Sequence, residues 1–252
     1  MKKVKRILSV LVLSLIVLPG LTAQEFSTGL DIYSSYIWRG AKFGSGPAFQ
    51  PYVEFSAGDF ALGAWGSVSA STDEALEMDL YASYSFGPVS IALTDYYFGG
   101  SWTDYTATHS LEPSLGLALG DFSFTAAAML LAKVDAADAV AEAPAMVNLE
   151  TGVITPAVEA SPAVVASGFG ETMDLYFEAG YSFETFDIAL GAGNGQYTRT
   201  EEDEDGKFNI CNISVGTSKE VKITDSFSLP ISGAVILNPA TGGFFITVGI
   251  SL

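Results

Sequence analysis

From residue 26 to its last residue, the chain repeats segments of roughly ten residues in which apolar and polar side chains alternate. In the segment 78–86, every second residue is apolar or aromatic: Met78, Leu80, Ala82, Tyr84 and Phe86. Successive side chains of a β-strand point to opposite faces, so each segment predicts a strand with one apolar and one polar face. Such strands fit a soluble β-sandwich, which buries the apolar faces between two sheets, or a transmembrane β-barrel, which turns them toward lipid.

The N-terminal residues 1–23 have the features of a secretory signal peptide. They open with a basic segment formed by Lys2, Lys3, Lys5 and Arg6. The apolar stretch Ile7–Leu18 is short for a transmembrane helix, and a small residue, Ala23, precedes Gln24. We predict cleavage after Ala23, with an uncleaved anchor as the alternative. Because export and alternating strands together are typical of outer-membrane proteins, the signal favours the barrel over the sandwich.

The predicted mature chain, residues 24–252, is strongly acidic. Loss of the signal leaves seven of the 11 Lys and Arg residues and all 29 Asp and Glu residues, a net charge of −22. This charge argues against nucleic acid as a partner. Cys211 is the only cysteine, so no internal disulfide is expected. One barrel would occupy most of this chain, and we expect it in the bacterial outer membrane.

The alternation predicts an all-β fold, a transmembrane up-and-down antiparallel β-barrel. The expected strands number about twelve: 28–39, 48–57, 60–70, 75–86, 89–98, 109–119, 122–133, 172–183, 186–195, 208–221, 227–237 and 243–252. Tight turns alternate in strict order with longer connections, of which 134–171 is the longest. Membrane barrels combine short periplasmic turns with long extracellular loops, and an even strand number places both termini in the periplasm.

Aromatic residues mark the expected ends of the strands. Those flanking the tight turns are Phe55, Phe60, Phe86, Phe122, Phe183, Phe186 and Phe227. Tyr36 and Trp38 are predicted at the opposite rim, on the lipid face of the first strand. The alternative is that these rings plug the ends of a soluble core. The last strand, 243–252, is expected to pair with the first and so leave no open edge.

The long loop 134–171 is rich in Ala, Val and Pro and contains a weak internal repeat. A hairpin centred on Glu150–Gly152 and a disordered segment are both compatible with this composition.

A second loop carries an acidic run that loosely resembles a calcium-binding loop. Its candidate ligands, weak ones, are Glu201, Asp203 and Asp205. The spacing fails, because the position of the bidentate Glu falls on Asn212. A solvated acidic tip is the preferred interpretation, and no metal site is predicted.

The alternate positions that form the polar face of each strand predict which side chains line the lumen. The candidates for the pore wall are Glu54, Glu77, Asp79, Tyr81, Glu112, Asp174, Tyr176 and Glu178. Only Arg39 and Lys133 are inward basic residues, and both are expected at the outer mouth. Unpaired carboxylates imply water, so we predict a hydrated, electronegative lumen that favours cations. The alternative is a closed, hydrogen-bonded plug of tyrosines, acids and Arg39.

Two positions fit the pattern poorly. Asp95 takes the lipid-facing parity, which places it at headgroup level unless a β-bulge resets the register. Cys211 also takes the outward parity, where a thiol acts as a small hydrophobe.

Catalysis finds little support in the residues. His109 is the only histidine, and Ser110 points to the opposite face of the same strand, which leaves Ser67 or Ser69 as remote partners. Asp174 with Glu112 would form an acid pair, but such pairs occur in any acidic pore. We therefore predict that the protein is not an enzyme and needs no cofactor.

The segment Tyr33–Gly40, followed by Gly46–Pro51, contains the pattern Ser-x-Tyr-x-x-Arg-Gly at Ser34, Tyr36, Arg39 and Gly40. In this the chain resembles the opening of the TorF-type porin family, small bacterial outer-membrane barrels. It is also similar to outer-membrane proteins of the Bacteroides group. The resemblance implies a passive channel.

These features together predict an outer-membrane, porin-like diffusion channel for small solutes that prefers cations. Its expected partners are outer-membrane lipid, lipopolysaccharide and small cationic or neutral solutes, while the solute itself and the oligomeric state stay open. The alternatives are a non-conducting barrel that displays its loops for adhesion or assembly and, less favoured, a membrane-embedded hydrolase.

Overall fold

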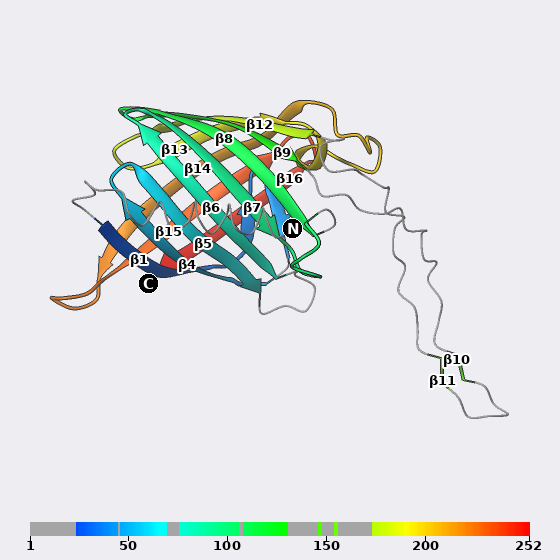
Figure 1. The fold of residues 1–252 in the computed structure, drawn as a ribbon, viewed down its shortest axis with the longest axis horizontal. Helices are drawn as coiled ribbons and strands as arrows, with labels where there is room; N and C mark the ends of the chain where they lie inside the picture. The colour runs from blue at the N-terminus through cyan, green and yellow to red at the C-terminus, as the bar shows by residue number, and fades with distance from the viewer. Residues whose placement is uncertain are drawn as a thin grey trace, which may run out of the picture.

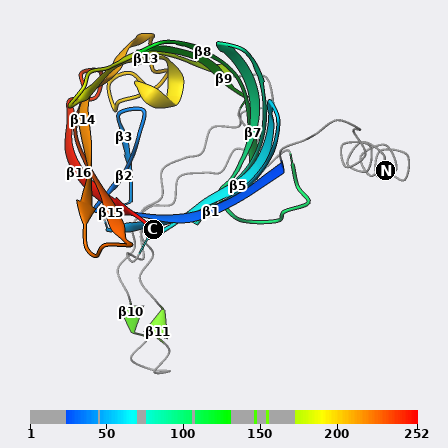
Figure 2. The same ribbon diagram turned by 90° about the vertical axis from the view of Figure 1, so that its left-hand side faces the viewer.

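A computed structural model describes residues 24–44, 46–69, 76–105, 108–130, 146–147, 154–155 and 173–252. Within these residues the chain forms one closed barrel of twelve antiparallel strands (Figures 1 and 2). This confirms the predicted all-β barrel and its strand number. The expected signal peptide, 1–23, and Lys133 lie outside the described residues.

The barrel wall follows the order of the sequence. Its strands are β1 (Gln24–Tyr33), β4 (Ala48–Ala57), β5 (Phe60–Ser69), β6 (Glu77–Phe86), β7 (Val89–Tyr97), β8 (His109–Leu119), β9 (Phe122–Leu130), β12 (Met173–Ser182), β13 (Asp187–Gly193), β14 (Asn209–Lys222), β15 (Ser228–Asn238) and β16 (Gly243–Ser251). Each pairs antiparallel with the next, and β16 returns to β1.

The connections alternate between the two ends of the barrel. One end carries 58–59, 87–88, 120–121, 183–186 and 223–227, and the others meet at the opposite end. We call these the turn end and the loop end. The alternation is the predicted one, and it follows from an up-and-down order in which every second connection returns to the same end. The lengths sort less strictly than predicted, because 239–242 at the loop end is no longer than 183–186.

The first predicted strand, 28–39, is wrong beyond Tyr33. The chain leaves the wall at Ser34 and Ser35, and β2 (Tyr36–Trp38) and β3 (Ala41–Phe43) form a separate two-stranded sheet. Figure 2 shows this sheet inside the ring of wall strands. We call residues 36–43 the plug hairpin. Tyr36 and Trp38 therefore do not lie at a lipid-facing rim.

The plug hairpin turns on two residues with positive φ. Arg39 has φ 51° and Gly40 has φ 81°. A two-residue loop with both central residues in this region matches the twist of an antiparallel pair. Alternation alone did not reveal the turn, because a hairpin inside the lumen and a straight wall strand have the same period of two.

The seam that closes the barrel is short. Asp31–Tyr33 of β1 lies opposite Gly249–Ser251 of β16, and Leu30 and Leu252 exchange two backbone hydrogen bonds of 3.0 Å. Where the chain turns inward, the Ser34 amide donates to Val248 O at 2.8 Å. The predicted pairing of the last strand with the first is confirmed, over a few residues only.

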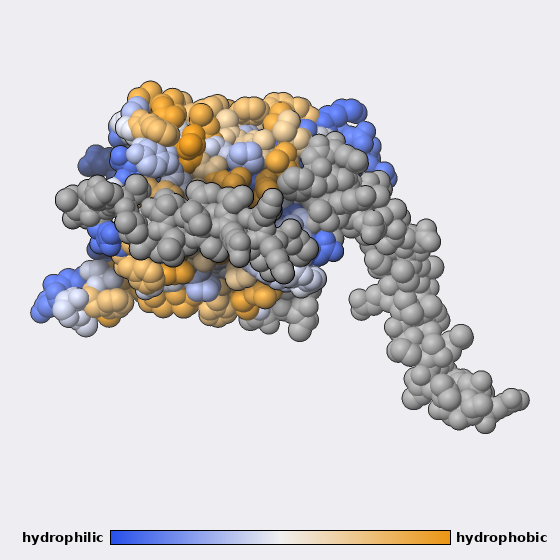
Figure 3. Space-filling view, viewed as in Figure 1, coloured by the Kyte–Doolittle hydropathy of each residue, from blue (hydrophilic) through white to orange (hydrophobic). Residues whose placement is uncertain are grey.

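The outer face of the wall is apolar, as the alternation predicts. On β6, Met78, Leu80, Tyr84 and Phe86 are exposed, whereas Glu77 and Asp79 on the opposite face are buried. Figure 3 shows a hydrophobic surface around the middle of the barrel with hydrophilic residues gathered toward its ends. Of the phenylalanines near the tight turns, Phe86, Phe122, Phe183, Phe186 and Phe227 are exposed. No described helix is long and apolar enough to span a bilayer.

Asp95 lies on this outer face without any bulge in its strand. The register of β7 is unbroken on both sides, and Asp95 Oδ1 lies 2.9 Å from His109 Nδ1. Tyr97, Trp102 and Tyr105 surround the imidazole, which is 1% exposed. The connection after β7 thus covers a polar pair that would otherwise lie bare among apolar residues.

The predicted outward position of Cys211 is wrong. Gly191 lies opposite Asn212, but Ala192 lies opposite Ile210, so Cys211 is the extra residue of a β-bulge. Its side chain is fully buried in a cluster with Ala127, Tyr176 and Tyr197. A bulge resets the two-residue period, and the sequence pattern carries no sign of it.

Within the long connection 131–172, β10 (Met146–Val147) pairs antiparallel with β11 (Ile154–Thr155). This confirms the hairpin alternative for these four residues. The predicted turn at Glu150–Gly152 lies outside the described residues.

Candidate functional site

The candidate site is the lumen, and its wall carries the predicted polar side chains. Glu77, Asp79, Glu112, Asp174 and Tyr176 are buried on the lumen face. Glu54, Tyr81 and Glu178 are half-buried nearer the turn end. The eight candidate residues thus divide into a buried set in the loop-end half and an accessible set in the turn-end half.

Arg39, at the tip of the plug hairpin, places its guanidinium in the loop-end half of the lumen. Its Nη1 and Nη2 atoms lie 2.5 and 2.9 Å from the two carboxylate oxygens of Glu112, a bidentate pair. Nη1 also donates to Tyr197 Oη at 2.7 Å. Arg39 was predicted at the outer mouth. It lies instead inside the lumen, with a side chain only 12% exposed.

Aromatic rings enclose the guanidinium of Arg39. Its Cζ atom lies 4.4 Å from the ring centres of both Trp38 and Tyr176 and 5.5 Å from that of Tyr197. Burial is the largest single influence and lowers the pKa of Arg39, but the hydrogen bond to Glu112 and the attraction of Glu112, Tyr197 and Tyr96 together raise it above its ordinary value. Arg39 therefore carries its charge throughout the ordinary pH range.

At Gly40 the hairpin backbone lies directly against the backbone of β14. A Cβ atom at this position would lie 1.9 Å from Cys211 O, so only glycine fits. Asn238 Nδ2 donates to Gly40 O at 3.2 Å and to Tyr197 O at 3.1 Å. Sequence reasoning missed Asn238; its polar character at an inward, loop-end position was the one available signal.

A second inward segment completes the plug. The 3-10 helix η1 (Gly195–Tyr197) follows β13 and lies inside the ring in Figure 2. The Gln196 amide donates to Asp174 Oδ2 at 3.0 Å, and Tyr197 is 1% exposed. The sequence placed this stretch in an outer loop, because nothing in its composition distinguishes a loop that folds inward.

The prediction of largely unpartnered acids is wrong for most of them. Glu54 accepts from Tyr81 Oη at 2.9 Å, and Glu178 accepts from Tyr176 Oη and, at 2.7 Å, from Asn212. Tyr36 Oη, on the plug hairpin, donates to Glu77 at 3.3 Å. Three buried side-chain oxygens of the described residues have no hydrogen-bond partner: Asp79 Oδ1, Ser67 Oγ and, directly after η1, Thr198 Oγ1.

Open space remains beside the plug, along the wall of β14–β16. One cavity of about 340 Å³ lies between the hairpin and this wall, and another of about 220 Å³ shares Tyr33, Ala234 and Thr247 with it. The wall there consists mainly of small or neutral residues: Ser214, Gly216, Ser218, Ser232, Gly233, Ala234 and Thr247. The plug hairpin therefore does not fill the lumen completely on this side.

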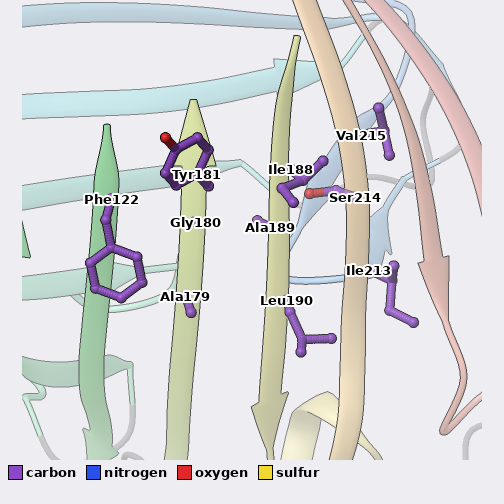
Figure 4. Close-up of a pocket in the computed structure, with 10 residues that line it drawn as sticks. All are labelled: Phe122, Ala179, Gly180, Tyr181, Ile188, Ala189, Leu190, Ile213, Ser214 and Val215. Carbon is purple, nitrogen blue, oxygen red and sulfur yellow. The ribbon is translucent and has the colours of Figure 1, made fainter. Parts of the chain in front are cut away.

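A further hollow, of about 390 Å³, lies on the outer face (Figure 4). Phe122, Tyr181, Leu190 and Val215 stand around a floor of small residues that includes Gly180. It holds no acid or base, and we assign it no chemistry.

Within the described residues, the side chains considered for a hydrolase do not come together. His109 lies on the outer face with Asp95, whereas Ser67 faces the lumen. Glu112 is held by Arg39 and Asp174 by the Gln196 amide, so the two do not form an acid pair.

In the acidic loop, Asp203 interacts with a neighbouring residue of the same loop. Asp203 Oδ2 accepts from the Lys207 amide at 3.1 Å, and Glu201 and Asp205 flank it in the exposed connection. No set of three or more His, Cys, Asp or Glu side chains in the described residues is arranged to hold a metal ion.

Comparison with known proteins adds little beyond the fold. No protein-family model matches the chain, and neither does any curated protein. The solved structure of Acinetobacter baumannii OccAB3 is similar with a TM-score of 0.36 and 8% sequence identity. The match covers 92% of this chain and 65% of that one, so the chain spans less than two thirds of its length. The functional proposal for this barrel therefore rests on the side chains of its own lumen.

Proposed function

We propose that the protein is an outer-membrane diffusion channel for small solutes, with a preference for cations and a constriction formed by the plug hairpin. A closed barrel has no unpaired edge, and an apolar outer face matches lipid. Lipid of the outer membrane is therefore the partner of the outer face.

The observation that carries the proposal is the contrast between acids and bases in the lumen. Arg39 neutralises Glu112, whereas the partners of Glu54 and Glu178 among the described residues are hydroxyl and amide groups. Acids without cationic partners in an accessible passage raise the local concentration of cations. The turn-end half of the lumen thus acts as an electronegative vestibule.

The path past the constriction follows the wall of β14–β16. Two cavities, which share Tyr33, Ala234 and Thr247, lie along this wall beside the hairpin and are the proposed route. A passage lined mainly by small and neutral groups, with Asp187 and Arg39 among its other lining residues, admits small solutes without binding them tightly. Small cations and neutral solutes are the substrate class that suits this path.

The resemblance to TorF-type porins agrees with this proposal in one respect. The residues of the shared pattern are those that build the plug: Ser34 attaches it to β16, Tyr36 contacts Glu77, Arg39 holds Glu112, and Gly40 makes the turn. The motif that suggested the family is therefore the constriction itself.

The test is conductance of the refolded chain 24–252 in a planar bilayer with a salt gradient. We expect small, discrete, ohmic steps and a reversal potential of cation sign. A variant with residues 36–43 replaced by a short Gly-Ser link should show larger steps. An anion-selective reversal potential in both proteins would refute the acidic vestibule.

The plug hairpin also favours a second candidate, a non-conducting barrel that displays its loops. Deletion of 134–171 distinguishes the two functions. A channel keeps its conductance or opens further, while a display barrel loses partner binding and conducts neither before nor after the deletion.

A further inference from the structure

We propose that the lumen binds an uncharged sugar ring, of monosaccharide size, in the cavity between the plug hairpin and the wall of the barrel. The side chains that would bind it are Gln50 of β4, Tyr33 of β1 and Ser214 of β14. That such a sugar crosses the membrane rests on the proposed function, whereas binding itself requires only the cavity.

The cavity has the size of a ligand site. Its volume of about 340 Å³ lies at the lower end of the roughly 300–1,000 Å³ that ligand pockets occupy, which suits one small molecule. Residues of the plug hairpin line it on one side, and residues of β1, β4 and β14–β16 line it on the other. A molecule held here contacts the plug and the wall at the same time.

Gln50 supplies a buried amide without a partner. The residue is only 5% exposed and lines the cavity. Within the part of the chain that the structure describes, its side-chain amide makes no hydrogen bond. An amide has two donor hydrogens and an acceptor oxygen, and buried polar groups are almost always satisfied. The amide therefore indicates a ligand that both donates and accepts hydrogen bonds.

Tyr33 supplies a flat apolar surface in the same cavity. A Cβ atom built on Gly249, its partner on β16, would lie 2.4 Å from both Cδ1 and Cε1 of the Tyr33 ring and 3.0 Å from Cγ. Such similar distances to three ring atoms mean that the ring lies face-on over the glycine. Its other face is turned away from the wall, toward the two cavities that Tyr33 lines.

The cavity carries no uncompensated charge. Among its lining residues Arg39 is the only ionic side chain, and its terminal nitrogens are held by Glu112 and Tyr197. Asp187 lines only the neighbouring cavity. A charged solute would lose hydration here without meeting a free counter-charge, which is unfavourable. The site therefore selects a neutral polar ligand.

A sugar ring matches these three features better than other neutral solutes do. Its hydroxyl groups both donate and accept, so they suit the Gln50 amide and the hydroxyl groups of Ser214 and Thr247. Its C–H face is apolar and packs on an aromatic ring such as that of Tyr33, which removes apolar surface from water. Open-chain polyols have the hydroxyl groups but lack the rigid face, and a purely apolar solute would leave the amide unsatisfied.

Saturation-transfer NMR of the chain 24–252, refolded in phosphatidylcholine vesicles, tests the site with D-glucose as the probe. We expect saturable binding of glucose and weaker binding of sorbitol, the open-chain polyol. Gln50→Leu has a side chain of similar size and loses no hydrogen bond between described residues, so the barrel should fold while glucose binding weakens about fivefold. Tyr33→Leu should weaken glucose binding about threefold.

Tyr52→Leu is the matched control. The Tyr52 ring also lies over a glycine of the neighbouring strand, Gly29, but it lines neither of the two cavities. This variant should bind glucose like the wild type. The barrel with residues 36–43 replaced by a Gly-Ser link lacks one side of the cavity and should bind glucose at least as weakly as Gln50→Leu.

Three results would overturn the site. The first is glucose binding that is undetectable, or that is unchanged in both Gln50→Leu and Tyr33→Leu. The second is equal binding of sorbitol, which would mean that no ring face is recognised. The third is tighter binding of gluconate or glucosamine than of glucose, which would mean that Arg39 or Asp187 recognises a charge. A barrel that binds glucose but never conducts would contradict the channel and leave this site intact, and one that conducts ions without binding glucose would do the reverse.

Discussion

The two halves of the lumen have the same kind of wall but different contents. In the loop-end half, Glu77, Asp79, Glu112 and Asp174 are almost fully buried. In the turn-end half, Glu54 and Glu178 take the same inward parity and remain partly accessible. What differs is the plug hairpin and η1, which lie inside the ring of strands (Figure 2) and contact Glu77, Glu112 and Asp174 of the loop-end half.

This contrast shows that a barrel of intermediate strand number does not decide by itself whether it is open. Eight strands leave an interior that side chains fill, and sixteen leave an aqueous channel. Here a few residues from two connections fill much of one half of the lumen. The fit of those residues, more than the width of the wall, should therefore determine conductance.

The most severe test of the contrast is Arg39→Ala. It leaves Glu112 buried without its cation and removes the centre of the aromatic cluster, so we expect a loss of about 3–5 kcal/mol of stability together with larger conductance steps. Lys42→Ala, at an exposed position of the same hairpin, is the matched control. Urea unfolding in vesicles and bilayer recordings measure the two effects. Identical behaviour of the two variants would show that the ion pair does not hold the plug.

Gly40→Ala tests the seating of the plug without removing a charge. The new Cβ atom would collide with Cys211 O in a backbone of φ 81°, and a strained backbone with a displaced hairpin should cost roughly 2–4 kcal/mol. Gly242→Ala has a similar φ of 74° and meets nothing within 4 Å, so it isolates the backbone strain. The difference between their unfolding free energies measures the collision. If Gly242→Ala costs as much, the contact with Cys211 is not what confines residue 40 to glycine.

His109→Ala tests whether the pair on the outer face contributes to stability independently of the plug hairpin. The imidazole lies on the outer face, so its loss should leave Asp95 unpaired and cost about 1–3 kcal/mol while the conductance stays unchanged. The double variant Asp95→Asn with His109→Ala should recover part of this loss, because the unpaired charge is gone. A double-mutant cycle of urea midpoints gives the coupling. A change in single-channel conductance would mean that the outer pair also positions the hairpin.

The smallest effect is expected in the accessible half. Glu54→Gln keeps an acceptor for Tyr81 Oη and should change stability by less than about 0.5 kcal/mol. It should lower the cation preference slightly, seen as a smaller reversal potential in a salt gradient. If the reversal potential stays unchanged even in the double variant Glu54→Gln with Glu178→Gln, these two acids do not determine the cation preference.

The wall of the barrel was predictable to within a few residues at most strand ends. Strands such as β4, β8 and β9 start where the alternation starts, and Phe244–Leu252 does place its even-numbered residues outward. Turn chemistry, as at Gly87 and Gly120 with positive φ, separates the strands. These features depend on neighbours in the chain, which a single sequence displays.

The site was predictable only as a list of inward residues. The partners of those residues, Glu112 with Arg39 and Glu178 with Asn212, join strands far apart in the chain. Asp95 shows the same limit, because its misfit was visible but His109 and the rings over it were not. Pairing across the lumen depends on register and loop path, which alternation does not encode.

The sequence by itself determined the strands, their inward and outward faces and the sorting of turns and loops, because each depends on a period of two and on local turn residues. Only the tertiary structure decided that Tyr36–Phe43 leaves the wall, that a bulge turns Cys211 inward and that Arg39 meets Glu112. A segment with alternating apolar and polar residues can form a wall strand or a hairpin inside the lumen equally well. The choice between them rests on contacts with side chains that are distant in the chain and become neighbours when the barrel closes.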